Sequence, residues 1–115
     1  MANTCLFCRI IAGEIPCDIV YQDEEFLAFR DIEPQAPKHV LIVPKTHIAS
    51  LGEITEQQQG FIGRLLVLAQ RLAGEEGIAK SGYRLAINCG SEGGQRIPHL
   101  HLHLIGGRKL SDQLG

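Results

Sequence analysis

The stretch IPHLHLHLIGG, residues 97–107, places three of the chain's five histidines at alternate positions. Side chains of a β-strand point alternately to its two faces, so an extended segment here separates histidines from leucines. Successive histidine Cα atoms would lie about 6.7 Å apart. We expect one face to pack into the core and the other to form a polar surface: Leu100, Leu102 and Leu104 against His99, His101 and His103.

Three histidines on one strand face indicate a functional site rather than an ordinary solvent-exposed face. A plain amphipathic strand explains one histidine well, but Thr, Lys and Glu are the usual residues on a solvated strand face. Imidazole serves proton transfer, nucleophilic attack or metal ligation near neutral pH. Two interpretations stay open from these residues alone. One is a metal site completed by a fourth group, and the other is a phosphoryl-transfer site with the middle histidine as nucleophile.

A glycine-rich loop, NCGSEGGQ at residues 88–95, precedes the histidines and favours phosphoryl transfer. Glycines let backbone N–H groups approach an anion closely, although most such loops are only turns. The pair Cys5 and Cys8 has the two-residue gap that metal sites and redox motifs share. No thioredoxin-type βαβ pattern follows the pair, so a redox role is the weaker interpretation.

Composition limits the class of protein. The 115 residues are 44% hydrophobic, enough to bury the core of one domain. The formal net charge is -2 and the basic residues do not cluster, which argues against nucleic-acid binding. The longest apolar run, residues 65–69, is too short to cross a membrane, and the N-terminus lacks a signal-peptide pattern. We therefore expect a cytoplasmic protein whose cysteines are thiols or metal ligands.

The rest of the chain predicts an α+β fold. A short helix within residues 6–15 should end near Gly13, before Pro16. A long helix should follow the capping-box pair Thr55 and Gln58, with an apolar stripe on one face: Phe61, Leu65, Leu68 and Leu72. The histidine run and four earlier segments predict a five-stranded, mostly antiparallel sheet, the four being 18–23, 26–31, 39–44 and 83–88.

The sequence resembles the histidine triad (HIT) nucleotide-binding proteins. HLHLHLI at 99–105 is similar to the family motif, and FLAFRDIEPQAPKHVLIVPKTHI at 26–48 and GYRLAINCGSEGGQ at 82–95 are similar to its Hint branch. The resemblance implies that residues 1–115 form one HIT domain. It also implies hydrolysis of nucleoside 5′-phosphoramidates and related AMP or GMP adducts through a nucleotidyl-histidine intermediate. A homodimer is implied as well, which agrees with the need to protect an edge strand.

The resemblance assigns roles residue by residue. His101 would be the nucleophile, His103 would contact the phosphate, and His39 would support them from the neighbouring strand. Asp31 would hold the ribose hydroxyls. The implied substrate-binding set is Phe29, Asp31, Ile32, Asn88, Gly94, Gln95, Arg96 and His103. We also expect a carbonyl on a neighbouring strand to fix the tautomer of His101.

Arg96 departs from the family pattern, in which many Hint proteins carry a serine or threonine thought to protonate the leaving group. Arginine stays protonated and is a poor general acid. It could stabilise phosphate charge or favour an acidic leaving group, or it could point to solvent while only its backbone N–H is used. Two alternatives therefore stay beside the phosphoramidase. One is a dinucleoside polyphosphate hydrolase or nucleotidyl transferase, and the other is a nucleotide-binding module without turnover.

Bacterial members of the family imply a structural zinc ion. The matching ligands are Cys5, Cys8, His47 and His99, a closed tetrahedral set without an open position. Such a site would pin the N-terminal helix to the sheet and leave only His101 and His103 facing the substrate. No organic cofactor, nucleic acid or membrane partner is expected.

Overall fold

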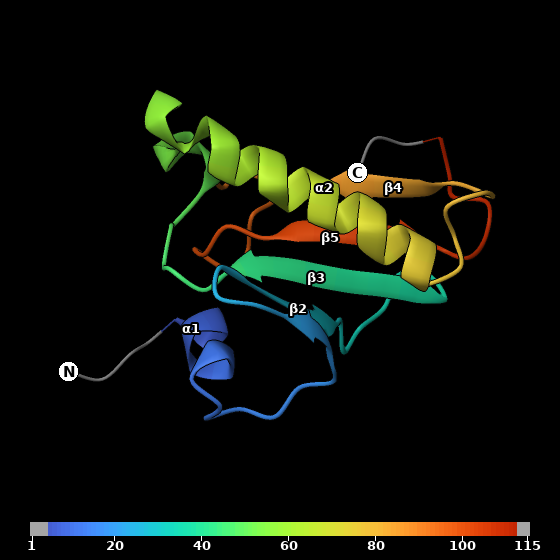
Figure 1. Cartoon of the computed structure of the whole chain (residues 1–115), viewed down its shortest axis with the longest axis horizontal. Coiled ribbons are helices and arrows are strands. Elements are labelled where there is room, and N and C mark those ends of the chain that lie inside the picture. Colours follow the sequence, from blue (N-terminus) through green and yellow to red (C-terminus); the bar gives the residue numbers. More distant parts are fainter. Residues whose placement is uncertain (1–4, 113–115) are drawn as a thin grey trace.

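Figure 1 shows the computed structural model of the chain, which describes residues 5–112. Its helices are α1 (Leu6–Ile11) and α2 (Gln59–Glu75), with short 3-10 turns η1 (Leu51–Glu53) and η2 (Glu56–Gln58) between β3 and α2. The strands are β1 (Ile19–Gln22), β2 (Phe26–Arg30), β3 (Lys38–Pro44), β4 (Tyr83–Ala86) and β5 (Leu102–Gly106). They form one sheet in the order β1-β2-β3-β5-β4, and every neighbouring pair is antiparallel. The predicted α+β fold is therefore confirmed.

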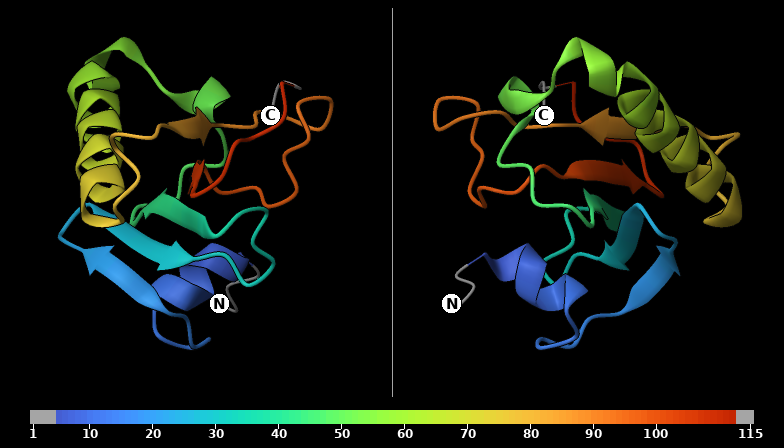
Figure 2. Two further views of the ribbon diagram at one scale, coloured as in Figure 1. Left: turned by 90° about the vertical axis from the view of Figure 1, so that its right-hand side faces the viewer. Right: turned by 60° about the vertical axis from the view of Figure 1, so that its left-hand side comes forward.

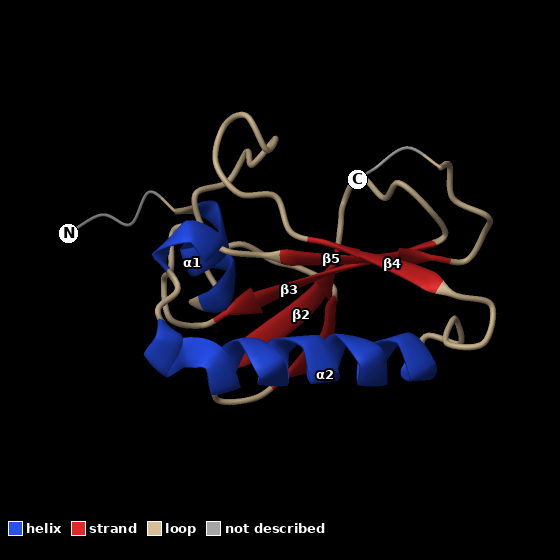
Figure 3. Cartoon of the chain, turned by 90° about the horizontal axis from the view of Figure 1, so that it is seen from above, coloured by secondary structure: helices blue, strands red, loops and turns tan. Residues whose placement is uncertain are grey.

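The two helices cover opposite faces of this sheet (Figures 2 and 3). Strand alternation sorts the core into two clusters. The cluster under α2 contains the predicted leucines of both partners: Leu65, Leu68 and Leu72 from the helix and Leu102 and Leu104 from β5. The cluster under α1 contains Phe7 with the alternate residues of β2 and β3, which are Leu27, Phe29, Leu41 and Val43. The histidines of β3 and β5 consequently belong to the α1 face.

Local signals set several element boundaries. The hairpin turns at Asp23, whose Oδ1 accepts the N–H groups of Glu25 and Phe26 at 2.8 Å each. The predicted capping box of Thr55 and Gln58 is present and opens η2, which runs directly into α2. No helix in the described part of the chain is both long enough and apolar enough to cross a membrane.

The histidine run is only half a strand, so the expectation that it forms the whole last strand was wrong. Proline at position 98 has no N–H to give to a ladder. The next backbone N–H groups bond elsewhere: His99 donates to the Ile97 carbonyl at 2.8 Å, and Leu100 donates to the Ile48 carbonyl at 2.7 Å. Regular pairing begins at Leu102. Leu100 is nevertheless buried, as the alternation predicted.

Candidate active site and metal centre

A cavity of about 560 Å³ opens on the α1 face of the sheet. Most residues proposed from the sequence line it: Phe29, Asp31, Ile32, His39, Asn88, Gly94, Arg96, His101 and His103. They come from the end of β2, from β3, from the loop after β4 and from the segment leading into β5. Residues distant in sequence therefore meet because β3 and β5 are neighbours, and the loops after β2 and after β4 reach the cavity from opposite ends of the sheet.

His101 lies at the bottom of this cavity and is only 7% exposed. Its Nδ1 lies 2.7 Å from the carbonyl oxygen of His99. A carbonyl can only accept, so Nδ1 carries the ring proton and Nε2 keeps its lone pair. No described residue is hydrogen-bonded to Nε2, and no buried side-chain nitrogen of residues 5–112 lacks a partner, so Nε2 is accessible from the cavity that His101 lines. The partner is two residues away in the same segment, so the expected carbonyl on a neighbouring strand was wrong.

His39 and His103 form a chain of defined tautomers. The backbone N–H of Gln35 donates to His39 Nδ1 at 3.0 Å, which places the proton of a neutral His39 on Nε2. That Nε2 lies 3.0 Å from His103 Nδ1 and donates to it, so His103 carries its own proton on Nε2. Burial lowers the pKa of both rings, and for His103 burial with the nearby His101 and His39 lowers it to about 4. Both rings are therefore neutral at pH 7.

The lowered pKa of His103 predicts a pH-dependent stability. The unfolded chain takes up this proton near pH 6.5, the ordinary value, whereas the folded chain takes it up only near pH 4. The unfolding free energy should therefore fall as the pH drops from about 6.5 to about 4, and stay level in this respect above 6.5. The unfolding free energy, measured by urea titration at several pH values, should fall less over this range for His103→Asn than for the wild type. A ring signal of His103 that titrates in NMR spectra near pH 6.5 would contradict this assignment.

Asp31 and Ile32 form the rim of the cavity beyond β2. One oxygen of Asp31, Oδ1, accepts the N–H of Glu33 at 2.8 Å, and the other, Oδ2, lies 3.5 Å from His39 Nε2. Ile32 is 91% exposed, so it has an uncovered apolar side chain beside the opening. The buried ring of Phe29 supplies a flat apolar wall deeper in the cavity.

The loop after β4 closes the other end of the cavity. Asn88 Nδ2 donates to the carbonyl of Gly93 at 2.8 Å, and Gly94 has a φ of +82°, a conformation that favours glycine. Gln95, by contrast, does not line the cavity. Its Nε2 donates to the carbonyls of Ala49 and Ile97, and its Oε1 accepts from Gly90 N–H at 2.9 Å. In this structure its amide holds the loop and has no donor directed at a phosphate.

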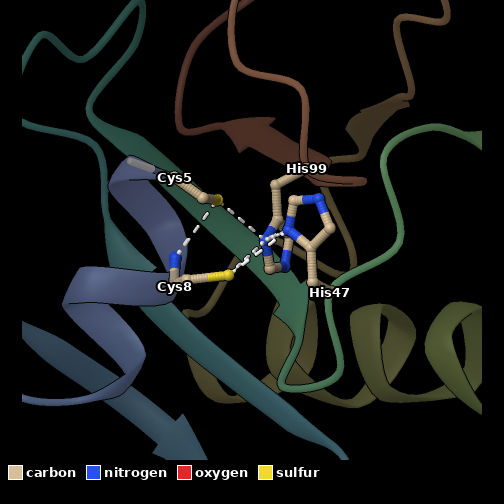
Figure 4. Close-up of side chains that lie close together, drawn as sticks. All are labelled: Cys5, Cys8, His47 and His99. Carbon is tan, nitrogen blue, oxygen red and sulfur yellow. Dashed lines mark hydrogen bonds between the residues drawn. The ribbon is translucent and has the colours of Figure 1, made fainter. Parts of the chain in front are cut away.

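A second polar cluster lies beside the cavity, where the N-terminus of α1 meets the sheet (Figure 4). Four donor atoms, one each from Cys5, Cys8, His47 and His99, lie within 4.8 Å of one another. The distance between the two Nδ1 atoms is 3.2 Å, and each thiol sulfur has an Nδ1 neighbour at 3.3 Å. The bond lengths of a tetrahedral zinc site imply edges of roughly 3.3 Å between nitrogens and 3.6 Å between nitrogen and sulfur. The cluster fits these dimensions.

The tautomer of His99 agrees with metal binding. Its Nε2 lies 2.8 Å from the carbonyl oxygen of Pro44, so Nε2 carries the proton and Nδ1 has a lone pair for an ion. The donor atoms of a second group, Asp31, His39 and His103, also lie within 4.8 Å of one another. In that group the nitrogen of His39 that would bind a metal ion, Nε2, carries a proton. The Cys2His2 cluster therefore could hold a metal ion, and the carboxylate–histidine group is better suited to hydrogen bonding.

Sequence reasoning missed the contribution of α1 to the cavity. Phe7 contacts the rings of Phe29 and His101 at centroid distances of 5.7 and 5.0 Å, and Leu6 and Ile10 also line the opening. Cys17 lines the cavity too. The helical spacing of Phe7 and Ile10 could have predicted this contribution. Cys5 and Cys8, at the start of the same helix, contact His99 and His47 and so place the helix beside the histidines.

Comparison with known proteins identifies the family. The HIT domain model matches residues 12–110, and the chain belongs to the HIT domain family. It is 46% identical over 114 residues to the purine nucleoside phosphoramidase of Escherichia coli K12, covering 99% of this chain and 96% of that one.

Solved structures agree in fold. A HIT family hydrolase from Legionella pneumophila Philadelphia 1 superposes with a TM-score of 0.94 at 47% identity, covering 97% of this chain and 100% of the other. A zinc-bound histidine triad family protein from Mycobacterium smegmatis has a TM-score of 0.78 at 34% identity, covering 97% of this chain and 80% of the other.

Proposed function

We propose that this chain hydrolyses purine nucleoside 5′-phosphoramidates and related AMP or GMP adducts, with His101 as the nucleophile. The observation that carries the proposal is the hydrogen bond from His101 Nδ1 to the His99 carbonyl, which leaves Nε2 with a free lone pair in the cavity. The similar phosphoramidase from Escherichia coli supports the choice of reaction.

The reaction proceeds through two displacements at phosphorus. In the first, a bond forms between His101 Nε2 and phosphorus and the P–N bond breaks, and the amine leaves with a proton from solvent. In the second, water attacks phosphorus, the bond to Nε2 breaks, and the nucleoside monophosphate leaves while the proton of the water returns to solvent. Two displacements replace one difficult attack by water on an anionic phosphate ester.

Neutral neighbours aid this reaction. His103 carries its proton on Nε2, the nitrogen left over after Nδ1 accepts from His39, and donates it to a phosphate oxygen as negative charge develops there. Asn88 donates from the opposite side through the second hydrogen of Nδ2, since the first is bonded to the carbonyl of Gly93. Because His103 is neutral, it acts through its Nε2–H as a hydrogen-bond donor and not as a positive charge.

The nucleoside lies toward β2. Asp31 accepts hydrogen bonds from the ribose diol through Oδ2, because Oδ1 is already engaged with Glu33 N–H. Phe29 and the exposed Ile32 flank the base, and Phe7 and Ile10 complete an apolar pocket. The large apolar area suits a purine better than a pyrimidine. The direct test is release of AMP or GMP from the corresponding 5′-phosphoramidates; nucleotide binding without release would favour the binding-module alternative.

The Cys2His2 cluster holds a structural zinc ion in this proposal. Its donor set and edges match tetrahedral zinc, and all four positions are filled by protein ligands, so the ion has no position for substrate. Bound zinc supplies a rigid cross-link and no catalytic group. It ties α1, and with it Phe7, to the loop after β3 and to His99.

The chain acts as a cytoplasmic homodimer in this proposal. The sheet order leaves β1 and β4 as edge strands, and a second copy that covers β4 would bury exposed hydrogen-bonding groups. Sedimentation equilibrium should give twice the 12.6 kDa mass of the chain.

A further inference from the structure

Among residues 5–112, Arg96 is the one lysine or arginine that lines the cavity. The six other arginines of the chain are all engaged by a carboxylate or a carbonyl: Arg9, Arg30, Arg64, Arg71, Arg84 and Arg108. Arg96 is exposed, and no hydrogen bond or ion pair engages its side chain within residues 5–112. Its guanidinium is therefore available to a ligand in the cavity.

The sheet order separates the charges of this cavity. Asp31 and Glu33 follow β2, whereas Arg96 belongs to the loop that follows β4. In the order β1-β2-β3-β5-β4, the strands that carry His39 and His103 lie between them. The cavity thus has an acidic end and a basic end, with the histidines in the middle.

We infer that Arg96 selects substrates whose leaving group carries a negative charge, above all amines bearing a carboxylate. The inference rests on the proposed function, in which Asp31 binds the ribose and His101 attacks phosphorus. With the nucleoside at the acidic end and phosphorus at the histidines, the leaving group points toward Arg96. A guanidinium is always protonated and can bind a carboxylate through two parallel N–H groups. The bond that breaks is the same P–N bond, and Arg96 takes no proton.

The test compares two substrates that differ only in this charge: the adenosine 5′-phosphoramidates of glycine and of glycinamide. The measured quantity is the ratio of their kcat/KM values. Arg96→Ala should lower the glycine-to-glycinamide ratio about fivefold, the size expected for an exposed ion pair. Arg96→Lys should retain part of the preference, and Arg96→Glu should lower the ratio further. Added salt should reduce the wild-type ratio, because exposed charges are screened.

Arg84→Ala is the matched control. It removes one positive charge and one hydrogen bond, to the carbonyl of Ser111, but Arg84 does not line the cavity. Its substrate ratio should equal that of the wild type. If both substrates are hydrolysed and Arg96→Ala leaves the ratio unchanged, Arg96 does not select the leaving group. If the wild type hydrolyses neither substrate, the proposed function itself fails.

Discussion

Replacement of His101 by asparagine should lower the hydrolysis of adenosine 5′-phosphoramidate by about 10⁴-fold or more, as loss of a covalent nucleophile does in other hydrolases. Asparagine can still donate its side-chain N–H to the His99 carbonyl, the bond that His101 Nδ1 makes at 2.7 Å. It has no nitrogen lone pair that can attack phosphorus. The measurement is kcat under saturating substrate, with the KM changing much less than kcat.

The control for this variant is nucleotide binding. His101 is buried against Phe7, so the smaller side chain could disturb the fold, and circular dichroism must match the wild type. AMP should bind the folded His101→Asn protein with nearly unchanged affinity. A folded variant that keeps a tenth or more of the wild-type kcat would remove His101 from the role of nucleophile.

Removal of the metal should have the second large effect, this time on stability. Structural zinc can contribute about 10 kcal/mol to the folding of a small domain, and a third of that would shift the melting temperature of a domain this size by more than about 10 °C. Cys8→Ser, which leaves His47 and His99 in place, should cause such a shift and lower the zinc content measured by mass spectrometry. The wild type should hold one zinc ion per chain.

Cys89→Ser is the matched control for the metal, because Cys89 is exposed and lies outside the cluster. It should retain the zinc ion and the wild-type melting temperature. Since α1 contributes Phe7 and Ile10 to the cavity, Cys8→Ser should also raise the KM for nucleotide substrates. A Cys8→Ser protein with full zinc content and unchanged melting temperature would show that the cluster is not the metal site.

Much of the fold was predictable because it depends on periodicity. The leucines of residues 100–104 and the apolar stripe of α2 are each one-sided patterns, and the structure packs Leu102 and Leu104 against that stripe. The capping box of Thr55 and Gln58 depends only on residues three apart. Such signals are local, and the sequence displays them directly.

The site was predictable as a set of residues but not as a geometry. The tautomer of His101 depends on the carbonyl of His99, which lies in the irregular segment before strand pairing begins at Leu102. Gln95 looks like a phosphate donor in sequence, but its amide is engaged by three backbone groups around Ala49, Gly90 and Ile97. These outcomes are set by tertiary contacts that no local pattern reports.

The most direct test of the covalent mechanism is to trap the intermediate. The protein is mixed with an adenosine 5′-phosphoramidate, quenched in alkali during turnover, digested and analysed by mass spectrometry. We predict an adenylyl group on the peptide that contains residues 97–107, attached at His101 and absent from the His101→Asn protein. Turnover without any adduct, or an adduct attached to His103, would contradict this account.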